Sequence, residues 1–351
     1  MFVREIVKRL APYTPGEQPK AGNVVKLNTN ENPYPPSPRC AETLAGFDMD
    51  RLRRYPDPVF SSLRKELAKI AGAKPENVFV GNGSDEILSL AARAFVEDGE
   101  AIGSLDPSYS LYRTLADIRG VEWRGFNSPA AVRGTAAKGV SLFLLTNPNA
   151  PTGGLLPRAE VEAFTKRFRG VVVVDEAYAD FARENCLPLA AAPGNRNVIV
   201  MRTFSKSYSL AGLRAGWCAG PAELIDALYK IKDSYNVDAL AQAVALAAAR
   251  DRRWMRANVR KVVATRGRLV KELRKRGWDV MPSEANFIFA RPAHAPAAEL
   301  FARLRENRIY TRYFPGPGTG DRIRITIGTD AQTDALLAAI DRLDVNIGQG
   351  A

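Results

Sequence analysis

Histidine is almost absent from this sequence, because His294 is the only one among 351 residues. Histidine is the commonest metal ligand and the commonest general base in proteins, so chemistry that depends on histidine clusters is excluded. His294 stands between Pro292 and Pro296 in a stretch that reads as a loop. We therefore expect a solvated side chain there and predict no metal site.

Cysteines and long apolar runs are also scarce. The three cysteines, Cys40, Cys186 and Cys218, are odd in number and far apart, which fits reduced thiols and matches no metal or redox spacing. No run approaches the roughly 18 apolar residues of a membrane span. The first ten residues carry charges throughout and lack the apolar core of a signal peptide. A cytoplasmic location without membrane contact is the expectation.

Basic residues exceed acidic ones, 50 against 38, for a net charge of +12. They are dispersed over helical patterns such as 251–276, with no basic cluster interleaved with aromatic residues. Nucleic acid is therefore not an expected partner. A basic surface would instead favour anionic small-molecule substrates through long-range attraction.

The pattern along the chain predicts an α/β fold with a mostly parallel sheet covered by helices. Short apolar runs alternate with helical periodicity, the runs being 78–80, 101–103, 140–146, 171–174, 198–201 and 215–219. At 351 residues, a large domain with a smaller companion is the default. We predict an extended N-terminal arm over residues 1–35, a large domain over 36–238 and a small α+β domain over 239–351.

Three residues indicate chemistry at the edge of this sheet. Asp175 follows the apolar run 171–174, Lys206 follows 198–201, and Arg214 lies eight residues further on. Open α/β sheets place their ligands at the carboxyl ends of their strands. A carboxylate, a lysine and an arginine at those ends suit pyridoxal 5'-phosphate, a phosphorylated cofactor with a ring nitrogen that binds covalently to lysine.

The stretch Gly81-Asn82-Gly83-Ser84-Asp85-Glu86 joins a predicted strand to a predicted helix. Glycines and the amides of a helix start can bind an anion, and Ser84 is expected to cap the helix. A plain capped turn is the alternative. Glu86 stands where a dinucleotide motif needs glycine, which argues against a nicotinamide dehydrogenase.

The order and spacing of these residues, together with 106–112 and 210–216, resemble the aspartate-aminotransferase-like group of pyridoxal-phosphate enzymes. Within that group the sequence is most similar to the histidinol-phosphate aminotransferases, from Leu10 to about Leu343. The resemblance implies that Lys206 binds the cofactor and moves the substrate proton, that Asp175 pairs with the ring nitrogen, and that Tyr178 contacts the ring hydroxyl. It also implies phosphate contacts from Ser84, Asp85, Ser205 and Arg214, and ring stacking by Tyr109.

One position departs from the family pattern of two adjacent asparagines. This chain reads Asn147-Pro148-Asn149-Ala150-Pro151-Thr152-Gly153, so Ala150 replaces the asparagine that commonly contacts the ring hydroxyl. Either Asn149 takes over that contact or Tyr178 makes it alone. We favour Asn149.

The resemblance also implies a substrate pocket and a homodimer. Arg324 matches the arginine that binds the substrate carboxylate, Arg312 matches a second basic residue of the pocket, and Tyr13 and Asn30 match residues of the arm. Tyr55 is expected to reach the cofactor phosphate of the neighbouring subunit. The implied reaction is amino transfer between L-histidinol phosphate and 2-oxoglutarate, giving imidazole acetol phosphate and L-glutamate in histidine biosynthesis.

Two alternatives on the same fold remain open. An aromatic amino-acid aminotransferase would use the same Arg324, and a threonine-phosphate decarboxylase would hold the leaving carboxylate perpendicular to the ring. A ligand-binding regulatory protein would need a nucleic-acid-binding extension, and the chain has no residues left over for one.

Overall fold

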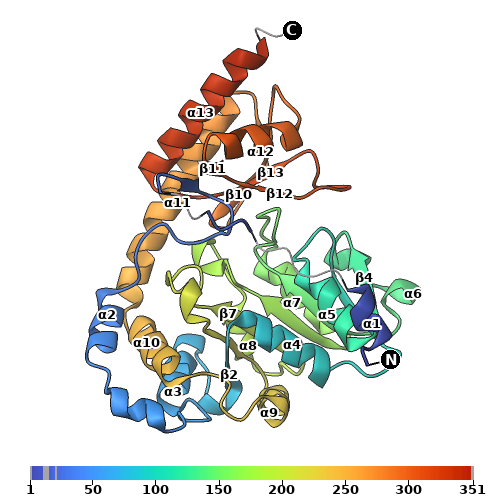
Figure 1. Ribbon diagram of the computed structural model, residues 1–351. Helices are drawn as coiled ribbons and strands as arrows, with labels where there is room; N and C mark the ends of the chain where they lie inside the picture. The colour runs from blue at the N-terminus through green and yellow to red at the C-terminus, as the bar shows by residue number, and fades with distance from the viewer. Residues whose placement is uncertain (1, 11–15, 20–21, 349–351) are drawn as a thin grey trace.

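The computed structural model describes residues 2–10, 16–19 and 22–348, with the backbone alone for 344–348. Tyr13 lies outside the described residues. A large domain and a smaller one are stacked end to end, and the long helix α11 (Arg252–Lys275) runs beside both (Figure 1). Across the described part of the chain, no helix combines the length and apolarity needed to cross a bilayer.

A seven-stranded sheet in the order β2-β8-β7-β6-β5-β3-β4 forms the centre of the large domain. Strand β8 is antiparallel to both of its neighbours, and the other pairs are parallel. This confirms the predicted mostly parallel sheet. The strands are β2 (Val78–Gly81), β3 (Ala101–Leu105), β4 (Glu122–Phe126), β5 (Val140–Thr146), β6 (Val171–Asp175), β7 (Val198–Thr203) and β8 (Gly216–Ala219).

Helices cover both faces of this sheet (Figure 1). The central strands are therefore apolar on both sides, and Val172, Val173 and Val174 of β6 are all fully buried. The helices of this part are α2 (Pro38–Ala45), α3 (Ser61–Ala71), α4 (Ser84–Ala94), α5 (Leu111–Arg119), α6 (Gly134–Ala137), α7 (Arg158–Arg167), α8 (Leu187–Ala190), α9 (Ala222–Ile231) and α10 (Ala239–Arg250).

The small domain has a four-stranded antiparallel sheet in the order β12-β13-β10-β9. Its core joins that sheet to α11 and to the two C-terminal helices, with Val262, Phe287 and Ile340 fully buried in one cluster. Its other elements are β9 (Asp279–Val280), β10 (Phe287–Arg291), α12 (Ala297–Glu306), β11 (Ile309–Tyr310), β12 (Arg312–Tyr313), β13 (Ile323–Thr326) and α13 (Asp330–Gly348).

The N-terminal arm is partly regular. It holds helix α1 (Glu5–Arg9) and strand β1 (Val25–Lys26), which pairs in parallel with β11 of the small domain. The Leu27 carbonyl then accepts a hydrogen bond from the Thr326 amide at 2.9 Å. Helix α1 contacts α5 of the large domain, and the arm is attached to the small domain further along the chain (Figure 1). The domain boundaries themselves stay a prediction.

Candidate active site

Asp175 and Lys206 come from neighbouring strands. Asp175 ends β6, where it is in register with Thr146 of β5 and Met201 of β7. Lys206 lies three residues beyond the last residue of β7. Because β5, β6 and β7 run in parallel, their carboxyl ends meet at one edge of the sheet. The two residues are therefore brought to the same place, as the sequence predicted.

Asp175 is almost completely buried, at 4% exposure. Its Oδ2 accepts a hydrogen bond from the Tyr112 hydroxyl at 2.8 Å, and its Oδ1 accepts one from the Ala177 amide at 3.1 Å. Burial raises the pKa of this carboxyl to about 6, although both hydrogen bonds act against the rise. A cationic N–H group placed against Asp175 would relieve that cost.

The Lys206 amine is partly buried, and its Nζ donates to the Thr29 carbonyl of the arm at 3.3 Å. Burial is the largest cause that lowers the pKa of Lys206, to about 8, and the charge of Arg324 adds to it. A substantial share of the amine is then neutral and nucleophilic near pH 8.

The backbone around Lys206 is held by groups that sequence reasoning missed. Asn32 Nδ2 donates to the carbonyls of Lys206 and Ser207, at 3.1 and 3.3 Å. The Ser207 hydroxyl donates to Asp180 at 2.5 Å, and the buried Arg202 donates to the same carboxylate at 2.8 Å. Arg202 is the one charged residue of β7, and that was the signal available in the sequence.

Arg202 also connects strands β6 and β7 through an ion pair. Its Nε donates to Glu176 Oε2 at 2.8 Å, and Glu176 directly follows Asp175. Both side chains are buried, at 8% and 1% exposure. Paired and hydrogen-bonded, these charges fix the distance between the ends of β6 and β7.

The glycine-rich loop begins helix α4, but Ser84 does not cap it. The N-cap is Gly83, and Ser84 is the first helical residue. The prediction that Ser84 caps the helix was wrong because Gly83 adopts a positive φ of 81°, which turns the chain one residue earlier. The backbone amides of the first turn still form a potential anion site.

Two glycines allow this loop to approach its neighbours closely. A Cβ on Gly83 would lie 2.7 Å from Arg214 Nη2, and a Cβ on Gly216 would lie 2.6 Å from the Ser84 nitrogen. Arg214 Nη2 stands 3.7 Å from Asp85 Oδ2, and both side chains are about half exposed. The predicted phosphate residues Ser84, Asp85 and Arg214 are thus brought together.

Ser205 directly precedes Lys206 in the chain and is buried, and its hydroxyl accepts a hydrogen bond from Thr203 at 2.9 Å. Loop amides, a hydroxyl and an arginine are the donors that a phosphate group requires.

Tyr178 and Asn30 are joined directly. Asn30 Nδ2 donates to the Tyr178 hydroxyl at 3.0 Å, and both side chains are buried. The Lys206 nitrogen lies 5.9 Å from the centre of the Tyr178 ring. Asn30 itself exchanges hydrogen bonds with Thr326 of β13, so it connects the two domains beside the lysine.

Asn149 is buried, and its side chain forms hydrogen bonds with neighbouring loop residues. Its Nδ2 donates to the Pro107 carbonyl and to Thr152 Oγ1, both at 3.0 Å, while its Oδ1 accepts from Ser108 at 2.9 Å. Both amide hydrogens are thereby engaged. These bonds hold the loop that carries Tyr109, whose ring packs edge-on against Tyr112 at 5.7 Å. The contact of Asn149 with a ring hydroxyl stays a prediction.

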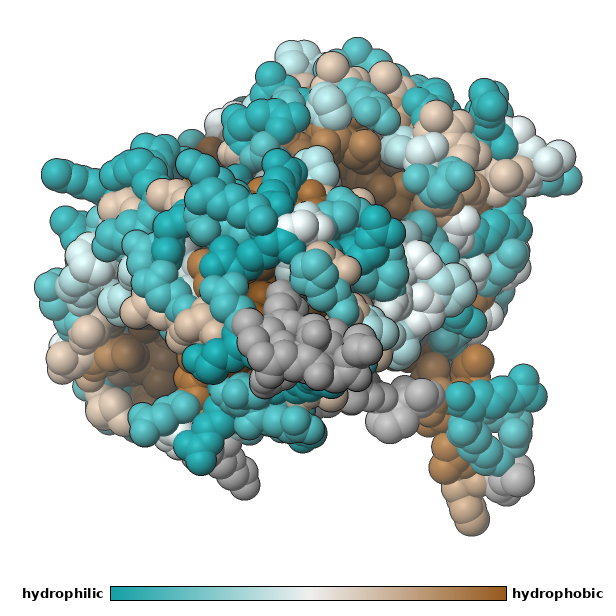
Figure 2. All heavy atoms as spheres, turned by 90° about the horizontal axis from the view of Figure 1, so that it is seen from above, coloured by the Kyte–Doolittle hydropathy of each residue, from teal (hydrophilic) through white to brown (hydrophobic). Residues whose placement is uncertain are grey.

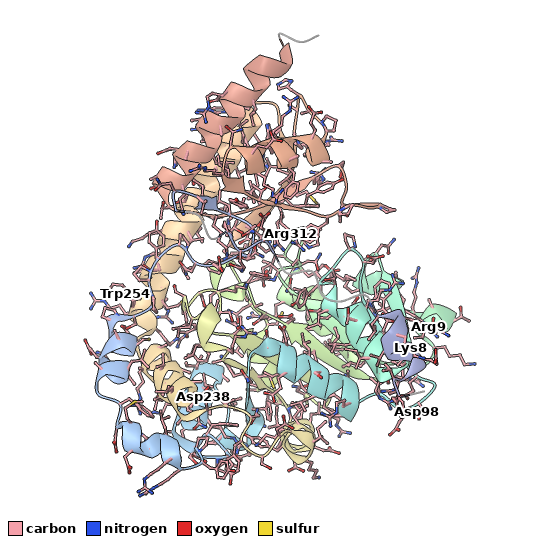
Figure 3. The ribbon with its side chains drawn as sticks, in the orientation of Figure 1. Lys8, Arg9, Asp98, Asp238, Trp254 and Arg312 are labelled. Atoms are coloured by element: carbon pink, nitrogen blue, oxygen red, sulfur yellow. The ribbon has the colours of Figure 1, made fainter. Side chains whose placement is uncertain are left out.

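Arg312 and Arg324 belong to the small domain. They are paired residues of the antiparallel strands β12 and β13. Arg324 Nη2 donates to the Asn28 carbonyl of the arm at 2.9 Å. Arg312 lies between the small sheet and the large domain (Figure 3).

Tyr55 lies apart from these residues. It is 80% exposed and stacks on Tyr235, with ring centroids 4.3 Å apart. An exposed position is what the predicted role in a neighbouring subunit requires, and that role stays a prediction.

The donor set fits pyridoxal 5'-phosphate. The buried carboxylate of Asp175 suits a protonated ring nitrogen, the amine of Lys206 suits an aldehyde, and the tight glycine loop with Arg214 suits a phosphate. Within the described residues, no group of three or more histidine, cysteine, aspartate or glutamate side chains is placed to hold a metal ion. His294 is exposed, as predicted, and the three cysteines are buried thiols outside any disulfide.

Known proteins share both the sequence and the fold. Residues 22–340 match the family "Aminotransferase class I and II". Histidinol-phosphate aminotransferase 1 of Nostoc sp. is 44% identical over 345 residues, which cover 97% of each chain. The crystal structure of histidinol-phosphate aminotransferase from Sinorhizobium meliloti, in complex with pyridoxal-5'-phosphate, has a TM-score of 0.90 at 25% identity and covers 100% of this chain and 98% of that one.

The fold is also shared by a protein of another activity. L-Threonine-O-3-phosphate decarboxylase from Porphyromonas gingivalis superposes with a TM-score of 0.81 at 24% identity, over 91% of this chain and 99% of that one. Such a likeness shows the fold alone. The family match and the near full-length similarity go further: this chain belongs to the class I and II aminotransferases and, among them, to the histidinol-phosphate aminotransferases.

Proposed function

We propose that this protein binds pyridoxal 5'-phosphate at Lys206 and transfers an amino group between L-histidinol phosphate and 2-oxoglutarate, in histidine biosynthesis. The observation that carries the proposal is the convergence of Asp175, Lys206 and Arg214 with the arginine pair of β12 and β13. One set suits the cofactor, and the other suits an anionic substrate.

The cofactor supplies an electron-withdrawing ring when it is bound. Asp175 holds a proton at the ring nitrogen, because its buried carboxylate is stabilised by a positive partner. Lys206 would act as the general base and acid that removes and returns the proton at the substrate Cα. A pKa near 8 suits this work, since the amine can both accept and return the proton at neutral pH.

The remaining residues orient the cofactor. The phosphate would be held by Ser84, Asp85, Ser205 and Arg214, Tyr109 would pack on the ring, and Tyr178 would contact the ring hydroxyl. Asn149 has both amide hydrogens engaged within its loop, whereas Tyr178 has a hydroxyl hydrogen to donate while its oxygen accepts from Asn30. The geometry therefore favours Tyr178 for the ring hydroxyl.

Arg312 and Arg324 bind the substrates. Their guanidinium groups can hold the phosphate of histidinol phosphate in one half-reaction and a carboxylate of 2-oxoglutarate or glutamate in the other. Asn30, placed between Tyr178 and β13, borders the same pocket. Tyr13 is assigned to it by family resemblance, outside the described residues.

The protein is a homodimer in this proposal, and Tyr55 completes the site of the partner. Large hydrophobic side chains are exposed on the single chain, among them Leu44, Met49, Leu52 and Tyr55. Seen from above, hydrophobic areas interrupt a largely hydrophilic surface (Figure 2). A second copy would cover such areas. The proposed location is the cytoplasm.

A direct assay tests the function. Purified protein loaded with pyridoxal phosphate is given histidinol phosphate or threonine phosphate, each with and without 2-oxoglutarate, and glutamate and carbon dioxide are both measured. Sustained glutamate formation that requires 2-oxoglutarate supports the proposal. Carbon dioxide release from threonine phosphate, without glutamate, would replace it with the decarboxylase alternative.

A further inference from the structure

Tyr112 is a buried tyrosine that the roles above leave unused. It lies on α5, and its side chain is fully buried together with its polar hydroxyl group. That hydroxyl stands 2.8 Å from Asp175 Oδ2 and 2.5 Å from Thr146 Oγ1. Tyr112 therefore contacts the one carboxylate assigned to the ring nitrogen of the cofactor.

The direction of these hydrogen bonds follows from counting protons. An ionised carboxylate only accepts, so the single proton of Tyr112 is donated to Asp175. Thr146 must then donate to the tyrosine oxygen. Ser108, 3.4 Å from Thr146, already donates its proton to Asn149 and leaves this arrangement undisturbed.

The chain Thr146 to Tyr112 to Asp175 places the positive end of an O–H dipole against the carboxylate. Burial and the charge of Asp175 raise the pKa of the Tyr112 phenol well above its ordinary value, so the proton stays on the tyrosine oxygen. In a buried site such a dipole draws negative charge away from the free side of the carboxylate.

We propose that Tyr112 is a positioning residue that sets how much negative charge Asp175 presents to the ring nitrogen of pyridoxal phosphate. This inference rests on the proposed function, because it requires the cofactor at Asp175. Thr146 acts one step further out, by polarising the Tyr112 hydroxyl.

The test uses the holoenzyme with Tyr112→Phe, which removes the hydroxyl and keeps the ring that packs against Tyr109. The visible absorbance of the bound cofactor is titrated with pH. Without the O–H dipole, more negative potential reaches the cofactor and favours its protonated form. The midpoint of this absorbance titration should move upward by roughly half a pH unit.

A double-mutant cycle tests whether Thr146 acts on Asp175 through the Tyr112 hydroxyl. Thr146→Val should shift the midpoint in the same direction by a smaller amount, and it should add nothing in the Tyr112→Phe background. Tyr229→Phe is the matched control, because it removes a hydroxyl bonded only weakly to the Val78 carbonyl at 3.4 Å. Its midpoint should equal that of the unmodified protein.

The outcomes separate the inference from the proposed function. A midpoint unchanged in both Tyr112→Phe and Thr146→Val, in proteins that still bind the cofactor, would overturn the role of Tyr112 and leave the aminotransferase assignment intact. An unmodified protein that acquires no cofactor absorbance would instead overturn the function, and this inference with it. If Tyr112→Phe does not fold, the Thr146→Val protein alone tests the role of Tyr112: an upward shift of its midpoint supports that role, and an unchanged midpoint overturns it.

Discussion

Arg312 and Arg324 are directly opposite each other on antiparallel strands, and the same aromatic ring lies beneath both. Their Cζ atoms stand 5.5 and 5.1 Å from the centre of the Phe314 ring. Like charges in paired positions of a sheet are destabilising. Stacking on Phe314 offsets part of that cost, and an anionic substrate bound between the two guanidinium groups would offset more.

Arg312→Gln should remove the stabilisation that a phosphate-bearing substrate provides, because the guanidinium group that would bind the phosphate is lost. Thermal unfolding with and without histidinol phosphate measures this effect. Arg322→Gln is the matched control, because Arg322 pairs with Asp279 at 2.6 Å. It should keep the ligand-induced rise in Tm, and a loss of that rise in both variants would contradict a specific role for Arg312.

The raised pKa of Asp175 predicts a pH-dependent stability. Its folded-state pKa of about 6 lies above the unfolded value, so ionisation opposes folding fully above pH 6 and has no effect below about pH 4. In the cofactor-free protein, Asp175→Asn should raise the free energy of unfolding at pH 8, by on the order of 2 kcal/mol. The gain should disappear as the pH falls from about 6 to 4.

Asp341→Asn provides a control of opposite sign. The Asp341 carboxylate pairs with Arg276, which lowers its pKa. Replacing it should therefore destabilise the protein at pH 8. Denaturant unfolding at several pH values compares the two variants, and an Asp175→Asn protein less stable than the unmodified one at pH 8 would argue against a costly buried carboxylate.

Lys206 should capture pyridoxal phosphate faster as the pH rises. The neutral amine is the nucleophile, so the rate of attachment to the cofactor-free protein should increase through a midpoint near pH 8. Arg324→Gln removes a charge that lowers the pKa of Lys206, and it should move this midpoint upward. Stopped-flow absorbance gives the rate, and mass spectrometry after borohydride reduction gives the site. A label on a lysine other than Lys206 would refute the assignment.

Tyr55 should act across a dimer interface. Tyr55→Phe and Lys206→Ala chains should each be impaired alone, whereas their mixture should recover about a quarter of the normal sites, since half of randomly formed dimers hold one complete site. The expected result is activity that appears only after subunit exchange. No recovery in dimers shown by light scattering to be mixed would place Tyr55 within its own subunit or outside the site.

Most of the large sheet could be predicted because its strands are buried on both faces. The run 140–146 gives β5 with the same bounds, and Val171–Val174 falls within β6. Strand β4 was missed because it lies at the sheet edge and carries Glu122 and Arg124. The two-residue strands β1, β9, β11 and β12 were missed because two residues are too short for a periodic pattern.

The site residues could be named from spacing and family resemblance, but their connections could not. Asp175 and Lys206 follow apolar runs that end at one sheet edge, and this is visible in sequence. The hydrogen bonds from Tyr112 to Asp175 and from Asn32 to the Lys206 carbonyl join residues 63 and 174 positions apart. No local pattern records such contacts. Ser84 was misplaced by one residue because a positive φ at Gly83 is invisible to a capping rule.

The specificity constants for histidinol phosphate and phenylalanine, measured in the unmodified protein and in Arg312→Ala, test the central claim most directly. Losing a desolvated charge-assisted contact should cost roughly 2–5 kcal/mol. We therefore predict that kcat/KM is higher for histidinol phosphate, and that Arg312→Ala lowers it far more for histidinol phosphate than for phenylalanine. A preference for phenylalanine, with both substrates affected alike by Arg312→Ala, would contradict the proposed substrate and leave an aromatic amino-acid aminotransferase.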